Sequence, residues 1–466
     1  PASFAAAMVG LRILDDFRAT MVATDLRARV SGLRTELVEL GLRNALHTGR
    51  PARVLEWAEL GRGRHLLERP ARPPADPILT QQLAELRATV QEVDEHTGSA
   101  RPAGVLLQRQ AALERNIRDH CRRQRGALSM AQPACPAPAE LSRSLGAAAL
   151  VEFAEADQTL HAVTVVAGRT RLYDLGPVAP LRDLVQWLPF ALRRLARQPA
   201  KPASTAAALA LLRSTAGQLD AALLRPLAET LGDRPLVLVP TGILQSMPWA
   251  LLPSGRGRAI TVAPSATLWH AARQRASASG PTVVVAGPGL PGALQEAQEI
   301  AALHGVAPLI GPSASVATVA DALDGAGLAH VAAHGQVRAD NPLFSALRLS
   351  DGPLTVYDLE RLRRGPDTVV LAACESGRNV VLAGDELLGL SSAFLARDTR
   401  QLIASVVPVP DAETAPLMVS FHRELVGGAS PAVALMHAQQ SIDFGEPAAL
   451  AAAAGFVCLG VGLAPA

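Results

Sequence analysis

The sequence contains almost no lysine and very few aromatic residues. Lys201 is the single lysine among 44 basic residues, so arginine carries nearly all of the positive charge. Aromatic residues make up only 3% of the chain, so alanine and leucine must fill most of the core. The 44 basic and 42 acidic residues leave a net charge of +2. This balance gives no overall attraction to nucleic acid, and the arginine bias is typical of a high-GC genome.

A membrane span, a signal peptide and a zinc motif are also missing. No run of about 18 or more consecutive apolar residues occurs, so no transmembrane helix is predicted. The opening string PASFAAAMVGLRIL lacks a basic stretch ahead of its apolar residues and predicts a helix instead of a signal peptide. The four cysteines form no Cys-x-x-Cys pair and no cluster with histidine at zinc spacing. We therefore expect a cytoplasmic protein with free thiols, no metal and no cofactor.

The length of the chain predicts more than one domain. A chain of 466 residues exceeds what one core usually holds, and 49% hydrophobic with 18% charged residues is typical of globular proteins. We predict a helical region over residues 1–130, a proline-rich linker over 131–143, an α/β subdomain over 144–275 and a second α/β subdomain over 276–466. The chain opens on Pro1 without a methionine, which leaves processing and a fragment of a longer protein both open.

Helical patterns dominate the first 130 residues. Residues 43–67 predict two helices around a turn at Gly49-Arg50-Pro51, with Trp57 as a packing anchor. The string ALHTGRPARVLEWAELGRGRHLL in this segment resembles a degenerate tetratricopeptide repeat. Apolar residues at 4-3-4-3 spacing over 79–93 predict the first helix of a helical hairpin.

The pattern then changes to that of an α/β fold. Residues 147–175 predict two or three hairpin strands with turns at Asp157-Gln158 and Gly168-Arg169. Farther on, short apolar strands alternate with helical segments, among them a strand over 307–310 and a helix over 387–396. Such alternation predicts a mostly parallel sheet flanked by helices on both faces.

Two apolar runs of strand length each end in a reactive side chain followed by a turn. The reactive side chain of HVAAHG is His334. That of VVLAACESG is Cys374, which lies 374 − 334 = 40 residues later. Parallel strands end at the same edge of an open sheet, where ligands and chemistry gather. If the two strands are neighbours, the imidazole and the thiol meet at one place.

A cysteine beside a histidine is the arrangement that thiol catalysis requires. The thiolate is the attacking species, and a free cysteine is only a few per cent thiolate at neutral pH. An imidazole removes the thiol proton and later protonates the leaving amine. The backbone N–H groups of Gly335 and Cys374 are positioned to hold an oxyanion. We predict Cys374 as the nucleophile and His334 as the general acid and base.

Cysteine and histidine at strand ends also have structural explanations. A buried cysteine in a core strand usually serves as a small hydrophobic residue, which is our prediction for Cys458. His330, inside its strand, is predicted to be structural as well. Cys374 differs because the polar residues Glu375, Ser376 and Gly377 follow it where the strand leaves the core.

These strings resemble the CHAT domain, a family of caspase-like cysteine peptidases often fused to tetratricopeptide repeats. HVAAHG, VVLAACESG and GDELLGLSSAFLARDTRQLIASVVPVPDAET carry the resemblance, which extends over residues 145–463. LVLVPTGILQSMPWALLPS and APSATLWHAAR, farther upstream, resemble the N-terminal subdomain of the family. The resemblance implies a caspase-type α/β fold, with His334 and Cys374 in the positions of the catalytic dyad.

The loop that lines the substrate pocket in this family differs here. Members usually have Trp-Pro-Val-Asp-Asp where this chain has Val-Pro-Val-Pro-Asp at 407–411, which removes an aromatic wall and one carboxylate. Some caspase-like peptidases place an aspartate two residues before the cysteine, where this chain has Ala372. The remaining acidic residues would suit a basic side chain before the scissile bond, or are solvated loop carboxylates. The candidates are Asp411 first, and then Asp385, Glu386 and Glu375.

Residues 287–292 form a competing motif, Gly-Pro-Gly-Leu-Pro-Gly, between a strand and a helix. The Gly-x-Gly-x-x-Gly pattern would suit a dinucleotide. However, Pro288 and Pro291 each remove an N–H donor, and no acidic residue follows about 20 residues later to hold a ribose. A plain connection between strand and helix is therefore favoured.

Together these features predict a cytoplasmic CHAT-type cysteine endopeptidase that cleaves a protein partner. The helical N-terminal region would recognise a substrate or regulatory protein and control access to the dyad, with no direct binding of nucleic acid. The alternative is a catalytically weak or inactive caspase-like scaffold that serves as a protein-interaction module, which the altered pocket loop favours.

Overall fold

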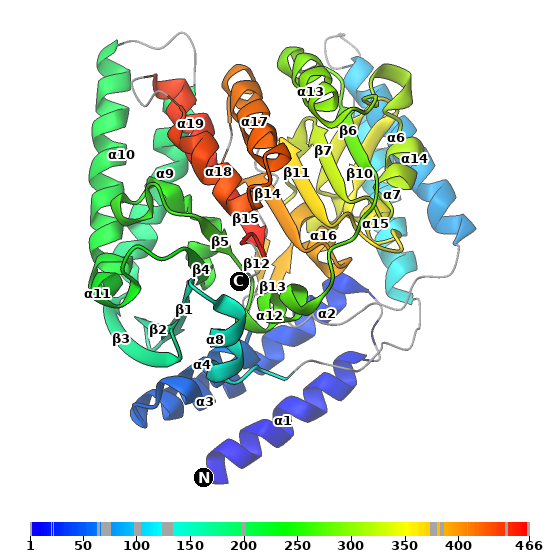
Figure 1. Cartoon of the computed structure of the whole chain (residues 1–466). Coiled ribbons are helices and arrows are strands. Elements are labelled where there is room, and N and C mark those ends of the chain that lie inside the picture. Colours follow the sequence, from blue (N-terminus) through cyan, green and yellow to red (C-terminus); the bar gives the residue numbers. More distant parts are fainter. Residues whose placement is uncertain are drawn as a thin grey trace.

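Ten strands form one mixed sheet in the computed structural model of the chain, and helices cover both of its faces (Figure 1). The structure describes residues 2–19, 21, 23–62, 66, 76–96, 104–123, 134–196, 202–372, 380–382, 386–407, 409–442 and 446–463. The strand order is β3-β2-β1-β4-β5-β15-β14-β11-β7-β6. The strands of this sheet are β1 (Ala149–Ala156), β2 (Thr159–Val166), β3 (Arg169–Pro177), β4 (Leu236–Val239), β5 (Ile260–Val262), β6 (Thr282–Ala286), β7 (Leu328–Ala332), β11 (Thr368–Ala372), β14 (Gln401–Ser405) and β15 (Phe456–Gly460).

The sheet consists of two parallel blocks that run in opposite directions. In the first block, β1, β4, β5 and β15 are parallel to one another. In the second block, β6, β7, β11 and β14 are parallel. The blocks meet where β14 pairs antiparallel with β15. The carboxyl ends of the two blocks therefore lie at opposite edges of one sheet, which the two predicted α/β subdomains share.

The antiparallel strands β2 and β3 extend the first block as predicted. Asp157 and Gln158 adopt positive φ angles of 48° and 59°, as a two-residue hairpin turn requires. The second turn uses Ala167 and Gly168, with φ angles of 47° and 79°, and so begins one residue earlier than predicted.

Two helical layers sandwich the sheet. α9, α10, α13, α17, α18 and α19 pack side by side over one face, and α3, α4, α8, α12 and α16 contact the other (Figure 1). The helices of the first layer are α9 (Ala179–Ala196), α10 (Pro202–Leu223), α13 (Pro291–His304), α17 (Asp411–Val426), α18 (Pro431–Gln440) and α19 (Pro447–Gly455). Those of the second are α3 (Thr35–His47), α4 (Pro51–Leu60), α8 (Pro138–Leu145), α12 (Ala266–Gln274) and α16 (Leu390–Ala396). Shorter helices are α11 (Ala228–Leu231), α14 (Val316–Leu323) and α15 (Val356–Leu359).

The N-terminal region is helical, as its periodicity predicts. α1 (Ala2–Ala19) and α2 (Thr24–Ser31) precede α3 and α4, and α6 (Pro77–His96) and α7 (Gly104–Arg123) form the predicted hairpin. Trp57 is buried, and a Cβ atom on Gly41 would lie only 1.9 Å from its ring, so α3 and α4 are in close contact. Leu79, Leu83 and Leu86 bury the stripe of α6 in the main core. None of the described helices is both long and apolar enough to cross a bilayer.

Two small sheets lie outside the central one and were not predicted. β8 (Gly335–Gln336), β9 (Ala346–Leu349) and β10 (Gly352–Thr355) form an antiparallel sheet in the order β10-β9-β8. β12 (Val380–Leu382) pairs with β13 (Glu386–Leu388). Each strand is short, so its alternation is too brief to read from the sequence.

The structure corrects three predicted boundaries. The predicted strand over 307–310 is reduced to a single bridge between Val285 and Leu309. The predicted helix over 387–396 begins only at Leu390, because Gly389 has a φ angle of 157° and separates it from β13. α8 begins inside the predicted linker, with Pro138 in its first turn and the Glu140 carboxylate accepting the Ala137 N–H at 2.9 Å.

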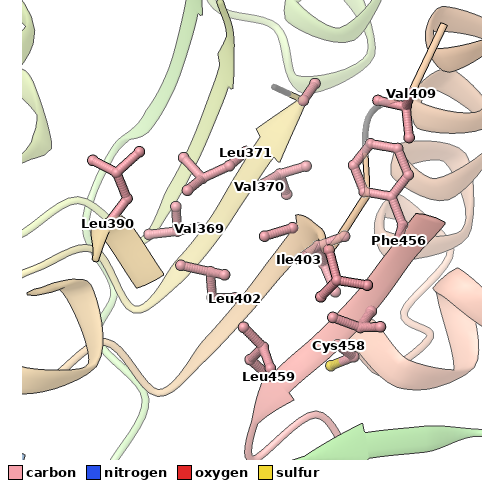
Figure 2. Packing of buried hydrophobic residues seen from close by; sticks show 14 of the residues in the cluster. Val369, Val370, Leu371, Leu390, Leu402, Ile403, Val409, Phe456, Cys458 and Leu459 are labelled. Atoms are coloured by element: carbon pink, nitrogen blue, oxygen red, sulfur yellow. The ribbon is translucent and has the colours of Figure 1, made fainter. Parts of the chain in front are cut away.

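Aliphatic side chains fill the core where the two blocks meet (Figure 2). Val370, Ile403 and Phe456 come from three neighbouring strands, β11, β14 and β15, and are at most 1% exposed. Cys458 lies among them with 1% exposure, as predicted for a small hydrophobic residue. The apolar runs that precede His334 and Cys374 are therefore anchored in the centre of the molecule.

Candidate active site

β7 and β11, the strands that lead to His334 and Cys374, are adjacent and parallel. Ala332 at the end of β7 pairs with Ala372 at the end of β11. His334 and Cys374 each follow these paired residues by two positions in the sequence. The predicted neighbourhood of the two strands is thereby confirmed, whereas Cys374 itself lies outside the described residues.

His334 is exposed beyond the end of β7, and its ring is oriented by a backbone carbonyl. Its Nε2 atom lies 3.2 Å from the carbonyl oxygen of Gly289, in the loop between β6 and α13. A carbonyl oxygen only accepts, so Nε2 carries the hydrogen and donates it. In the neutral ring this leaves the Nδ1 lone pair free, so Nδ1 is the nitrogen that can take up a proton.

Gly335 is held opposite β9 in a position that leaves its N–H unused by that strand. The Arg348 N–H donates to the carbonyl oxygen of His334 at 2.9 Å, and Gly335 pairs with Leu347. Antiparallel ladders alternate between hydrogen-bonded and non-hydrogen-bonded pairs, so Gly335 occupies a non-hydrogen-bonded one. Its N–H group therefore points away from β9.

The three cysteines that the structure describes are poor nucleophiles. Burial raises the pKa of Cys121 and of Cys458 to about 12, and it raises the pKa of Cys135 as well. These thiols stay protonated at neutral pH. The chain has four cysteines, so Cys374 is the one that remains as a candidate nucleophile.

Asp411 lies at the same edge of the sheet but is already engaged. Its Oδ2 atom accepts the N–H of Gly292 at 2.9 Å, which caps α13, while Asp411 itself begins α17. A carboxylate at two helix N-termini is favourably placed for the helix dipoles. Of the other acidic candidates, Asp385 and Glu375 lie outside the described residues, and Glu386 begins β13, where its side chain is not described.

The glycine-rich loop over 287–292 is filled by the chain itself. A Cβ atom on Gly287 would lie 2.5 Å from the backbone oxygen of Arg348 and 2.8 Å from Ala333 Cβ, so only glycine fits there. Gly289 holds His334, and Gly292 donates to Asp411. The loop thus supports the site rather than forming an open phosphate cradle.

A cleft of about 580 Å³ opens beside His334. The helical hairpin α6–α7 forms one wall, and β8, β9 and β10 form the other. Apolar side chains line much of it, and Asp94 contacts Arg348 at 2.9 Å as an ion pair between exposed side chains. The residues that line the cleft include Val90, Val93, Leu107, His334, Gly335 and Arg348.

Two further features bear on the assignment. A cavity of about 510 Å³ lies at the opposite edge of the sheet between α3, α4 and the turn after β1, and its lining contains neither histidine nor cysteine. In the part of the chain that the structure describes, no group of three or more His, Cys, Asp or Glu side chains converges as a metal site would.

Sequence reasoning missed the wall that α6–α7 contributes and the carbonyl that orients His334. The hairpin lies more than 200 residues before His334 in the sequence, so no local pattern connects them. The glycine motif was the local signal nearest to this carbonyl, because it follows β6, the strand that pairs with β7.

Solved structures of cysteine peptidases resemble this chain. Two structures of the Saccharomyces cerevisiae separase–securin complex match with TM-scores of 0.53 and 0.52 at 8% identity, covering 99% of this chain and 40% of that chain. The Arg-specific cysteine proteinase gingipain R matches with a TM-score of 0.38 at 12% identity, covering 60% of this chain and 75% of that one. No curated protein matches the chain. The likeness to separase confirms the predicted caspase-like α/β fold.

The family follows from a direct match to the sequence. The CHAT domain profile matches residues 213–460, which is more than half of the 466 residues. The matched range includes the glycine-rich loop, all four strands of the second block, and β4, β5 and β15 of the first. The chain therefore belongs to the CHAT domain family.

Proposed function

We propose that the chain is a cysteine endopeptidase in which Cys374 is the nucleophile and His334 is the general acid and base. The observation that carries this proposal is the in-register pairing of β7 with β11, each followed two residues later by one member of the pair. The elimination of the other three cysteines by their raised pKa values supports it.

The free nitrogen of His334 defines the proton path. Nε2–H stays bonded to the Gly289 carbonyl, so Nδ1 accepts the thiol proton of Cys374. The thiolate attacks the carbonyl carbon of the peptide bond, and the imidazolium then gives its Nδ1 proton to the departing amine. Water hydrolyses the resulting thioester, and its proton returns by way of Nδ1 to the thiolate.

The backbone N–H groups of Gly335 and Cys374 are the proposed oxyanion donors. The N–H of Gly335 faces away from β9, which leaves it available to the negative charge that develops on the substrate oxygen. A single donor of this kind contributes about 2.7–4 kcal/mol to the transition state in characterised enzymes.

The cleft beside His334 supports a protein substrate that enters as an extended segment. Its walls belong to the hairpin and to the β8–β10 sheet, so the helical region contributes to recognition as well as to packing. Asp411 is the proposed partner for a basic side chain before the scissile bond, ahead of Asp385, Glu386 and Glu375. The separase of the comparison is bound to a protein, securin, which is consistent with a protein partner here.

The test is covalent labelling of the full chain, because the natural substrate is unknown. Acyloxymethyl ketones carrying arginine or leucine at the reacting position are incubated with the wild type and with His334→Ala. Labelled cysteines are identified by mass spectrometry of peptides. We expect rapid labelling of Cys374 and a reaction about 10²–10⁴-fold slower in His334→Ala, since a positioned base contributes a factor of that size.

Cys135 provides the internal reference for this experiment. Its raised pKa predicts slow labelling at neutral pH in every variant. If Cys374 reacts no faster than Cys135, or reacts independently of His334, the endopeptidase proposal fails. The second candidate function, a caspase-like interaction scaffold, would then be preferred, and the altered loop at 407–411 is the observation that favours it.

A further inference from the structure

Three histidines and one glutamate form a buried polar cluster that the proposed peptidase mechanism does not use. His330 lies on β7, His422 on α17, and both Glu296 and His304 on α13. His330 and His422 are 0% exposed and Glu296 is 2% exposed, whereas His304 is only partly buried. The cluster therefore extends from the surface of α13 to the centre of the sheet.

The side chains of this cluster contact one another in a linear order. His304 Nε2 lies 2.9 Å from His422 Nδ1, and His422 Nε2 lies 3.1 Å from His330 Nδ1, both as hydrogen bonds. His330 Nε2 then lies 3.0 Å from Glu296 Oε1 as an ion pair. Among the described residues, neither of these last two atoms has a further hydrogen-bond partner. His330 is thus the basic side chain that faces Oε1 of this buried carboxylate.

Apolar and aromatic side chains surround the buried end in the part of the chain that the structure describes. β6 and β11 place Val284 and Val370 beside His330, and Phe421 packs its ring against His422. A buried carboxylate without a positive partner is costly, and His330 is the basic side chain that Glu296 contacts. The other charged residues of α13 and α17 lie outside the cluster: Glu299, Asp411, Glu413, Arg423 and Glu424.

The order of contacts allows two hydrogen-bond patterns. In the first pattern all three rings are neutral, and His330 directs its Nε2–H toward Glu296. His330 Nδ1 then accepts a hydrogen bond from the Nε2–H of His422, and His422 Nδ1 accepts one from the Nε2–H of His304. When His330 is an imidazolium, its Nδ1–H donates to His422 Nε2, and His422 Nδ1–H donates to His304 Nε2. Both hydrogen bonds between histidines reverse their direction between the two states.

We propose that these four residues form a single-proton relay, which admits a proton from solvent at His304 and stores it on His330 beside Glu296. The proton binds Nδ1 of His304, the Nε2 proton of His304 passes to His422 Nδ1, and the Nε2 proton of His422 passes to His330 Nδ1. One proton enters, no bond between heavy atoms changes, and the cluster gains one positive charge.

The pKa values of the other two histidines agree with storage of a single proton. Burial lowers the pKa of His304 and lowers that of His422 well below its usual range, and repulsion from a charged His330 adds to both effects. These two rings therefore remain neutral while His330 is charged. Because His330 lies on the strand that leads to His334, the relay couples the packing of that strand to solvent pH.

Nuclear magnetic resonance of the full chain with ¹⁵N-labelled histidine tests the relay. Two-bond ¹⁵N–¹H correlations identify which ring nitrogen carries hydrogen, and spectra are recorded in steps between about pH 8 and 5, the range over which histidine ordinarily titrates. We expect His422 to change from the Nε2–H to the Nδ1–H tautomer, with the same midpoint as proton uptake on His330. A purely structural cluster would keep one tautomer of His422 throughout.

Glu296→Gln is the decisive variant and Glu299→Gln is its matched control on the exposed side of the same helix. We expect Glu296→Gln to abolish both proton uptake on His330 and the tautomer change of His422, and Glu299→Gln to leave both intact. A wild-type His422 that keeps one tautomer, or rings that titrate with unrelated midpoints, would overturn the proposal. The wild-type titration decides this even if Glu296→Gln fails to fold, and its outcome does not depend on peptidase activity.

Discussion

Each of the two parallel blocks of the sheet creates a crevice at the carboxyl ends of its strands, and the side chains at these two crevices differ. In the first block, Arg62 donates to the carbonyl oxygens of Val239 at 3.1 Å and Pro240 at 2.9 Å, and also to that of Phe153. Its Nε atom lies 3.2 Å from Glu152, and both side chains are almost fully buried. Arg62, which follows α4, thus places a buried charge at the carboxyl ends of β1 and β4, and the cavity of about 510 Å³ lies beside it.

Glu59 of α4 is also buried in the first block. Its carboxylate accepts the N–H groups of Ala266 at 2.8 Å and Thr267 at 2.7 Å, which caps α12 directly after β5. In the second block, His334 is exposed beyond its strand, and a cleft of about 580 Å³ adjoins it. The sheet therefore provides a crevice at each end, and the strands followed by His334 and Cys374 both belong to the second block.

The helices beside the crevice of the second block are attached in a different way. α7 reaches the segment after His334 through Glu114, which receives two hydrogen bonds from Arg338 at 3.1 and 3.2 Å. α6 reaches α15 through Arg87 and Asp358 at 3.1 Å. These pairs are more accessible to solvent than Arg62 and Glu152.

The largest expected effect comes from removing the buried charge of Arg62 in the first block. Arg62→Ala removes the positive charge beside the buried carboxylate of Glu152, so we expect the free energy of unfolding to fall by about 3–5 kcal/mol. Urea unfolding of the full chain measures it. Arg53→Ala on α4 removes an exposed ion pair with Glu56 and should cost less than about 1 kcal/mol. Equal stability of the two variants would show that Arg62 does not anchor the region.

The next prediction concerns how closely α3 and α4 pack against each other. Gly41→Ala places a Cβ atom 1.9 Å from Trp57 Cε3, so α3 and α4 must separate, at a cost of about 1–3 kcal/mol. Gly217→Ala in α10 meets nothing within 4 Å and should stabilise its helix by about 0.5–1 kcal/mol. Thermal unfolding compares the two variants. A change of the same sign in both would contradict the packing seen between α3 and α4.

A smaller effect is expected at the wall of the crevice of the second block. Glu114→Ala removes the two hydrogen bonds to Arg338, and we expect the free energy of unfolding to fall by about 1 kcal/mol. The change should be local, so hydrogen exchange should accelerate in α7 and in the segment after His334 but not in α4. Arg115→Ala, at the next position on the exposed side of α7, is the matched control and should leave exchange unchanged. Uniform acceleration in both variants would argue against a specific attachment.

A further effect depends on pH and belongs to the helical layer over the second block. His304 and His422 both lie in the helical layer over the second block, and both have lowered pKa values. Near pH 6.5 the unfolded chain therefore binds protons at these two residues that the folded chain does not bind. Stability is therefore fully present above that pH and decreases as pH falls, by at most about 1.4 kcal/mol per pH unit for each residue. Urea midpoints at about pH 7.5 and 5.5, on either side of the ordinary histidine pKa, measure this slope. We expect His304→Asn with His422→Asn to flatten it, while an unchanged slope would assign it to other groups such as His161 and His270.

Most of the secondary structure was predictable because its signals are local. The turn at Asp157 and Gln158, the stripe of α6 and the strands before His334 and Cys374 all follow from spacing and turn residues. The predicted boundaries were wrong where a second element contains or contacts the same residues. β13 takes the first residues of the predicted helix before α16, and the bridge of Leu309 replaces a predicted strand.

The candidate site was predictable only in part. His334 and Gly335 lie at a strand end beside β11, as expected, and His330 and Cys458 are buried inside their strands. Asp411 was predicted as a pocket residue without knowledge of its bond to Gly292, because that contact joins residues 119 positions apart. Its role toward a substrate stays a prediction.

The amino-acid pattern alone determined which strands exist and which reactive residues stand at their ends, because apolar period and turn chemistry act over a few neighbouring residues. Only the tertiary structure decided that the two blocks oppose each other, that Arg62 pairs with Glu152 at one crevice and that α6–α7 borders the other. It likewise brought His304, His330 and His422 into one hydrogen-bonded line. Such contacts depend on the packing of whole elements, which no short stretch of sequence encodes.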